Sequence, residues 1–285
     1  MAELRAAHVS HEMGMHTEQL AGRTQQRFFA VDMGGERFTY PLAPEVDFNK
    51  RAEFDAAALD TQGINVRIRE LMNEGHGTIV VHDPGAKHSL GVGILNRLNL
   101  YFEGSLGYFG VGLIDGPNVR IKGRVGWSCA ENMLAGTVLI EKNAGSCFGA
   151  AIRGGDLVCK GDVGARTGIN QKGGTIIVGG RTGAFSGFMM QRGRMVVLGD
   201  AGANLGDSMY DGTIYVGGRI ASLGVDAVEA EMTDRDCAWL ERKLMLYGLY
   251  GLKAPKPLKE MTKIVAGKQL WNYDNLEPAE KKLVL

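Results

Sequence analysis

The stretch that decides the fold reads GTVLIEKNAGSCFGAAIRG (136–154), GDLVCKGDVGARTGINQKG (155–173), GTIIVGGRTGAFSGFMMQR (174–192) and GRMVVLGDAGANLGDSMYD (193–211). These segments align as units of 19 residues without an insertion or a deletion, and a fifth unit begins at Gly212. A fixed period of this size is typical of solenoids, because one unit cannot bury its own apolar face and has to stack on its neighbours.

Glycine marks the same places in every unit. It opens the unit, and it returns nine and thirteen positions later, where the chain has to turn. Because glycine adopts φ > 0 with little steric cost, these places predict the corners of each turn. The three rows are Gly136, Gly155, Gly174 and Gly193, then Gly145, Gly164, Gly183 and Gly202, and then Gly149, Gly168, Gly187 and Gly206.

Each unit also contains one short β-strand. Apolar residues stand two and four positions after the opening glycine, as in Val138 and Ile140. Alternate residues of a strand face the same side, so these pairs predict an interior ladder. We therefore expect an all-β core, a single-stranded parallel, right-handed β-helix whose turns stack at about 4.8 Å. Leucine-rich repeats of similar period need an L-x-x-L-x-L-x-x-N pattern that the sequence lacks.

The repeat extends towards the N-terminus with less regularity. Val119 and Ile121 take the interior places of one earlier turn, and Leu100 and Phe102 take those of the turn before it. A first strand is expected just after residue 77. The predicted β-helix thus has about seven turns and occupies residues 75–225.

The N-terminal extension, residues 1–74, is expected to cap the solenoid. Its segment 28–40 predicts a short hairpin around two glycines. Residues 47–59 predict one helix. Residues 61–73 have apolar side chains at helical spacing and predict a second helix, which plugs the open end of the solenoid.

The C-terminal region, residues 226–285, is expected to begin with a helix that ends near Tyr247. Two glycines and two prolines follow within ten residues and end it. Residues 258–285 then form a tail that contains Trp271 and Tyr273. Spaced apolar residues on a tail that cannot fold alone predict docking onto a neighbouring surface.

The composition excludes several classes of protein. The 285 residues carry 32 Lys and Arg against 32 Asp and Glu, so no global charge attracts the chain to nucleic acid or to an anionic membrane. No apolar run approaches the roughly 20 residues of a membrane helix, and no signal peptide is recognisable. The four cysteines form no C-x-x-C pair and fit a reduced protein. We expect a cytoplasmic chain that binds neither nucleic acid nor membrane.

The common catalytic motifs are absent from the sequence. There is no phosphate-binding loop of the G-x4-G-K-[ST] type, no complete dinucleotide fingerprint and no G-x-S-x-G elbow. His8, His11 and His16 match helical metal-site spacing only weakly and have no cysteine nearby, so they predict a solvated tail. Asp162, Asp200 and Asp207 stand beside corner glycines and predict turn residues that bond their own backbone. We expect no catalytic residue, no cofactor site and no metal site on this chain.

The outward-facing row of the strands is apolar as well. The third position after the opening glycine should face away from the core, yet it carries Leu139, Val158, Ile177, Val196 and Tyr215. A contiguous apolar surface usually marks an interaction site, so these residues form a possible partner interface. The alternative is burial under the C-terminal helix of the same chain. In both cases we expect this row to be covered.

The repeat resembles that of a known family. The spacing G-x2-G-x3-G, as in Gly161, Gly164 and Gly168, is similar to that of the glycine-repeat β-helix domain at the C-terminal end of the glutamate synthase large subunit. The segments AENMLAG (130–136) and GDAGANLGDSMY (199–210) look especially like stand-alone versions of that domain. Such versions are separate subunits of enzymes such as N-methylglutamate synthase. The resemblance covers about residues 60–230.

The resemblance implies a subunit without catalytic residues in an assembly whose functions are divided among chains. One partner would be a class II glutamine amidotransferase-like subunit and another an FMN-binding glutamate-synthase-like subunit, with this chain as the scaffold between them. FMN and an iron–sulfur cluster would belong to the second partner. The assembly would form N-methylglutamate from methylamine and glutamate, or glutamate by amide transfer.

Two other functions are compatible with parts of the sequence. The related β-helix subunit of formylmethanofuran dehydrogenase, or of a formyltransferase/hydrolase complex, shares the repeat, although the C-terminal helix and tail look more like the glutamate synthase branch. An independent enzyme with a site in the solenoid groove, as in carbohydrate-acting β-helices, would need carboxylates clustered on one face. Apart from Asp162 and Asp200, the aspartates of the repeats do not share a repeat position; the set is Asp156, Asp162, Asp200, Asp207 and Asp211.

Overall fold

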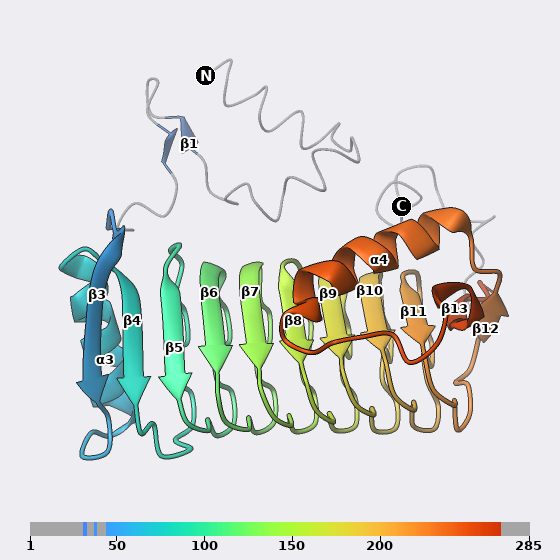
Figure 1. The fold of residues 1–285 in the computed structure, drawn as a ribbon, viewed down its shortest axis with the longest axis horizontal. Helices are drawn as coiled ribbons and strands as arrows, with labels where there is room; N and C mark the ends of the chain where they lie inside the picture. Colours follow the sequence, from blue (N-terminus) through green and yellow to red (C-terminus); the bar gives the residue numbers. More distant parts are fainter. Residues whose placement is uncertain (1–30, 33–36, 39–43, 269–285) are drawn as a thin grey trace.

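The computed structural model describes residues 31–32, 37–38 and 44–268, and its main body is one 11-stranded sheet. The strand order is β12-β13-β11-β10-β9-β8-β7-β6-β5-β4-β3. Strands β3 to β11 follow one another along the chain, and each pairs in parallel with the next. Figure 1 shows them side by side, each joined to the next by a connection that returns behind the sheet. The predicted parallel β-solenoid of about seven turns is confirmed.

The register of the strands follows the 19-residue period from β5 to β11, whereas β4 and β5 pair residues that are 21 apart. Val138 pairs with Leu157 and Leu157 with Ile176, and the same column runs through every turn from β4 to β11. A slip by one residue would turn the apolar set outward, so the apolar pattern specifies this register. The strands are β3 (Asp47–Asp55), β4 (His76–His82), β5 (Asn99–Glu103), β6 (Asp115–Ile121), β7 (Ala135–Ile140), β8 (Asp156–Cys159), β9 (Lys172–Val178), β10 (Arg192–Val197) and β11 (Thr213–Val216).

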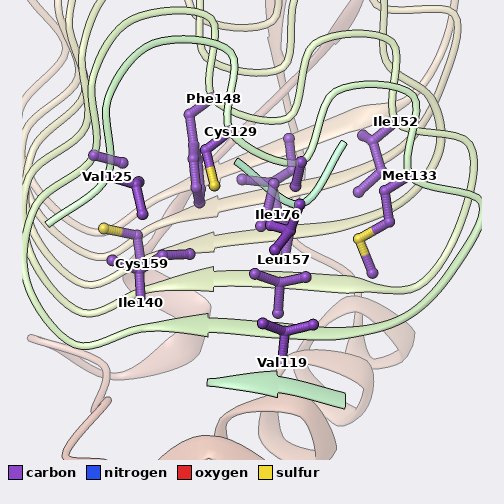
Figure 2. Close-up of a cluster of buried hydrophobic side chains, with 14 of the residues drawn as sticks. Val119, Val125, Cys129, Met133, Ile140, Phe148, Ile152, Leu157, Cys159 and Ile176 are labelled. Carbon is purple, nitrogen blue, oxygen red and sulfur yellow. The ribbon is translucent and has the colours of Figure 1, made fainter. Parts of the chain in front are cut away.

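The core lies between the sheet and the connections behind it. Figure 2 shows Leu157 and Ile176 of the strands pointing towards Phe148 and Ile152 of the connections, and all four side chains are fully buried. A second column of residues closes one corner of the core through isolated parallel bridges between successive turns. Its members are Leu106, Val125, Ala144, Val163, Thr182, Ala201 and Ile220.

The glycine rows have two different causes. Left-handed backbone explains two of them: Gly155, for example, has φ +80° and Gly149 has φ +67°. The row that contains Gly164 is not left-handed, which corrects the expectation that all three rows need φ > 0. Steric exclusion explains this row, because a Cβ on Gly164 would lie 2.5 Å from the backbone nitrogen of Ser146 in the preceding turn.

The first strand of the sheet was not expected from the sequence. The predicted helix over 47–59 is wrong, because Asp47–Asp55 is strand β3 and pairs in parallel with β4. Its residues Ala52 and Phe54 pack against the core. The sheet therefore begins before residue 75, and pairing with β4 outweighs the local helical pattern of this segment.

The second predicted element of the N-terminal extension is confirmed. Helix α3 spans Thr61–Asn73, and the Asp60 side chain caps it by accepting a hydrogen bond from the Gly63 amide (2.7 Å). Three of its side chains, Ile64, Ile68 and Leu71, are buried in the core at the N-terminal end of the solenoid, as expected of a plug. The predicted hairpin is also present, as the antiparallel strands β1 (Val31–Asp32) and β2 (Arg37–Phe38).

The C-terminal region begins with a strand rather than a helix. Residues Ala227–Ala230 form β12, and helix α4 spans Asp234–Gly248 behind a capping box made by Thr233 and Asp236. The 3-10 helix η1 (Leu258–Glu260) leads into β13 (Thr262–Ala266), which pairs antiparallel with β11 and β12. The described part of the tail thus docks on its own solenoid; Trp271 and Tyr273 lie outside the described residues.

Candidate functional site

The apolar row on the outer face of the sheet is covered by the chain itself. Its five residues, one each from β7 to β11, are at most 4% exposed. Figure 1 shows α4 crossing this face, over strands β8 to β11. The row is Leu139, Val158, Ile177, Val196 and Tyr215, and the residues that bury it are Leu240, Leu244, Tyr247, Leu252 and Met261.

This burial corrects the prediction of a partner interface at the five residues. The structure has the alternative arrangement, in which the C-terminal helix of the same chain covers the row. Both arrangements account for apolar side chains at outward positions, so the row alone could not distinguish them. Any partner has to contact α4 or another part of the solenoid.

A half-buried ion pair anchors the C-terminal half of α4. Lys243 Nζ lies 2.7 Å from each carboxylate oxygen of Asp156 in β8, and the Tyr247 hydroxyl donates to the same carboxylate at 2.7 Å. Burial, and then the neighbouring Asp156 charge, raise the pKa of Tyr247, so its hydroxyl stays a donor. These partners are 87 and 91 residues apart in the chain, and no local pattern pairs them.

A second anchor fixes the start of α4. The Asp236 carboxylate accepts hydrogen bonds from Lys263 Nζ (2.8 Å), from the Tyr215 hydroxyl (2.6 Å) and from Thr233. Burial alone would raise the pKa of Asp236, but the hydrogen bonds from Lys263, Thr233 and Tyr215 outweigh it and lower that pKa strongly. One carboxylate therefore joins α4 to β11 and β13.

The corner aspartates bond the next turn rather than their own backbone, which corrects the prediction for them. Asp162 accepts from the backbone amide of Arg181 (2.8 Å) and from its guanidinium (3.0 Å), and Asp200 does the same with Arg219. The amide hydrogen bond and then the guanidinium hold the pKa of each aspartate below its usual range. Each pair is 19 residues apart, so these carboxylates tie successive turns together.

The cysteines are free thiols with different surroundings. Cys129 and Cys159 are fully buried in the core, whereas Cys147 and Cys237 are half-buried. Burial raises the pKa of the Cys159 thiol to about 12, and it also raises that of Cys129. Two of the four thiols are thus neutral core residues.

Within residues 44–268, the titratable groups described above hold the turns and α4 in place. The same part of the chain has no group of three His, Cys, Asp or Glu side chains that could hold a metal ion. His8, His11 and His16 lie outside the described residues. None of the described helices combines the length and apolarity needed to cross a membrane.

The comparisons with known proteins agree with this repeat architecture. The sequence model of a family described as "GXGXG motif" matches residues 60–237, from α3 through every later turn of the solenoid into α4. Protein GlxC of Rhizobium meliloti (strain 1021) is 39% identical over 60 residues, which are 21% of this chain and 26% of GlxC. The match therefore spans about a quarter of the length of that relative. Because the family match covers more than half of the sequence, this chain belongs to the GXGXG motif family, the glycine-repeat β-helix family of the glutamate synthase C-terminal domain.

Proposed function

We propose that this chain is a non-catalytic scaffold subunit of a glutamate-synthase-like complex. The observation that carries the proposal is the family match over residues 60–237, which includes all the regular turns. An active site in a repeat protein needs residues that depart from the repeat. Here the 19-residue register runs from β5 to β11, and polar side chains such as those of Asp162 and Asp200 join neighbouring turns.

The proposed partners divide the chemistry between them. A class II glutamine amidotransferase-like subunit releases the amide nitrogen of glutamine, and an FMN-binding subunit with an iron–sulfur cluster carries out the synthase reaction. In the N-methylglutamate synthase form, the complex uses methylamine and glutamate; in the glutamate synthase form, it transfers the amide nitrogen.

The fold suits a scaffold for a physical reason. Each turn forms backbone hydrogen bonds with the turns on both sides, so the solenoid resists bending more than a set of helices joined by loops. The outer row is already buried under α4, and the two anchors, Asp156 with Lys243 and Asp236 with Lys263, hold that helix. Such a body can keep two catalytic subunits at a fixed separation without contributing a catalytic group.

The experiment is affinity purification of the tagged full-length chain from its native host, with mass spectrometry and a visible absorption spectrum. We expect an amidotransferase-like chain and a yellow-brown flavoprotein in stoichiometric amounts. Formyltransferase or metallohydrolase chains would instead assign the protein to the formylmethanofuran type of complex. A colourless protein without partners would refute the scaffold function.

A further inference from the structure

Exposed apolar side chains gather in the N-terminal turns of the solenoid. In the turns from β4 to β11, the large apolar side chains that are more than a third exposed lie between positions 95 and 127; others lie on β3, α3 and α4 and around Val225. Four of them occupy the connections that follow β5 and β6, and we call these four the aromatic patch. They are Tyr108 (43% exposed), Phe109 (46%), Leu113 (50%) and Trp127 (57%).

Part of the aromatic patch is a stacked column. The rings of His88 and Tyr108 are 4.7 Å apart and those of Tyr108 and Trp127 are 5.5 Å apart, both in stacked geometry. Stacking of this kind stabilises neighbouring turns. It leaves the ring edges exposed, and it does not involve Phe109 or Leu113.

The later turns show that the solenoid does not need aromatic residues at this position. The same place in the repeat holds one serine and then three alanines. In each of these turns the backbone carbonyl at that place accepts the same inter-turn hydrogen bond, at 2.8–2.9 Å, as the carbonyls of Tyr108 and Trp127 do. The equivalent residues are Ser146, Ala165, Ala184 and Ala203.

Phe109 and Leu113 are more exposed than Phe185 and Met189, the large apolar residues at the equivalent positions of a later turn. Both Phe109 and Leu113 have left-handed backbone, with φ +60° and +55°, as do the equivalent residues of the later turns. Four of the five later turns place a small or polar residue at the position of Phe109, and the fifth has Phe185, which is half-buried. The repeat therefore does not require a large, exposed apolar side chain at either position.

Arg124, three residues before Trp127 of the aromatic patch, has an exposed side chain. Arg124 belongs to the corner column in which Arg181 pairs with Asp162 and Arg219 pairs with Asp200. Its own neighbours in that column are uncharged: its backbone amide bonds the Ser105 hydroxyl, and the residue one turn later is an asparagine. Arg124 forms no ion pair with any residue between 44 and 268.

We propose that the aromatic patch and Arg124 form the docking surface for a partner subunit, one that presents an apolar protein surface with a carboxylate at its rim. Apolar contact supplies affinity at the centre of such an interface, and the rim charge selects the partner and its orientation. The inference rests on the proposed scaffold function and adds to it the place at which one partner binds.

The test uses the complex purified from the native host through the tagged full-length chain. Each variant takes the residue that another turn already carries at the equivalent position, so the solenoid should tolerate it. The docking variants are Phe109→Ser with Trp127→Ala, and separately Arg124→Asn. The matched controls are Phe185→Asn, on a distant turn, and Arg166→Asn, which removes an exposed charge elsewhere.

We expect the double variant to retain at least fivefold less of one partner subunit, while both controls retain it as the wild type does. Arg124→Asn should weaken retention at low salt and much less at high salt, because salt already screens a rim charge. Far-UV circular dichroism and thermal unfolding of each isolated variant check that it is folded. If the double variant is unstable, Phe109→Ser alone is tested for partner retention, because Phe109 does not belong to the ring stack and its replacement leaves the stack intact.

Three outcomes overturn the inference in distinguishable ways. If folded docking variants retain every partner as the wild type does, the patch is not the docking surface and the scaffold function stands. If the variants lose only self-association, the patch joins two copies of this chain. If the wild type retains no amidotransferase or flavoprotein at all, the scaffold function fails, and the patch as a subunit-docking surface fails with it.

Discussion

Ile177→Ala tests the conclusion that α4 belongs to the fold and not to a detachable arm. Ile177 is fully buried between β9 and α4, whereas its neighbour Ile176 is fully buried on the opposite side of the strand, inside the solenoid. Truncation of a buried isoleucine to alanine costs about 2–5 kcal/mol, and the cost is lower where the surroundings can close the cavity. Helix α4 is held by side-chain contacts, so it can move towards the sheet and partly close the cavity left by Ile177→Ala. The turns of the solenoid are joined by backbone hydrogen bonds, so they can close the cavity left by Ile176→Ala less easily. We therefore expect about 2–3 kcal/mol for Ile177→Ala and about 3–5 kcal/mol for the control Ile176→Ala.

Two measurements check these values and their location. Urea denaturation gives the free energy of unfolding of each variant, and hydrogen exchange read by mass spectrometry shows which segments lose protection. Ile177→Ala should increase exchange mainly in residues 233–261, which cover the outer row, whereas Ile176→Ala should increase it in the strands. A cost below about 0.5 kcal/mol for Ile177→Ala, typical of a surface position, would falsify the burial of the outer row under α4. Equal exchange changes in both variants would contradict the separation of the two apolar clusters.

Three further predictions follow from the described contacts. Gly164→Ala should lower the thermal midpoint of unfolding, because the added Cβ has no room against the preceding turn. The control Gly248→Ala should leave the midpoint unchanged, because no atom lies within 4 Å of the Cβ added there. Equal midpoints for the two variants would contradict the steric account of the glycine row that contains Gly164. Because folding lowers the pKa of Asp236 from its ordinary 3.8, its carboxylate contributes stability above that pH and loses the contribution as the pH falls towards the folded-state pKa. The difference in unfolding free energy between wild type and Asp236→Asn should accordingly shrink between about pH 5 and pH 2, and a constant difference would speak against the anchor. Cys129 should react with a thiol reagent only on unfolding, and the half-buried Cys147 faster; rapid labelling of Cys129 in the folded protein would show that the core is open.

The sequence by itself determined the solenoid, its register and its interior. Each turn pairs with turns that carry the same pattern 19 residues away, so local alternation and the period together specify which side chains face inward. Ile176 and Leu157 are examples, since both were expected in one interior column and both lie there. The glycine rows were recognised too, although packing between turns and not φ explains the row that contains Gly164.

The ends of the chain depended on pairing that no local pattern contains. Residues 47–55 have a weak helical pattern, yet they become a strand because β4 offers an unpaired edge. Strand β13 likewise forms only because β11 and β12 are brought beside it. Segment length and spacing could not predict these partners, because strand pairing is a property of two segments.

The surfaces were decided by the tertiary structure alone. The sequence required the outer row that contains Ile177 to be covered, but the choice between a partner and α4 depended on contacts such as Asp156 with Lys243, 87 residues apart. The exposure of Phe109 and Trp127 also became visible only when neighbouring turns were placed around them. Interior positions recur with the alternation of each strand, so one chain segment is enough to predict them. Whether an outward-facing side chain is buried or exposed depends on which other segments of the molecule pack against it.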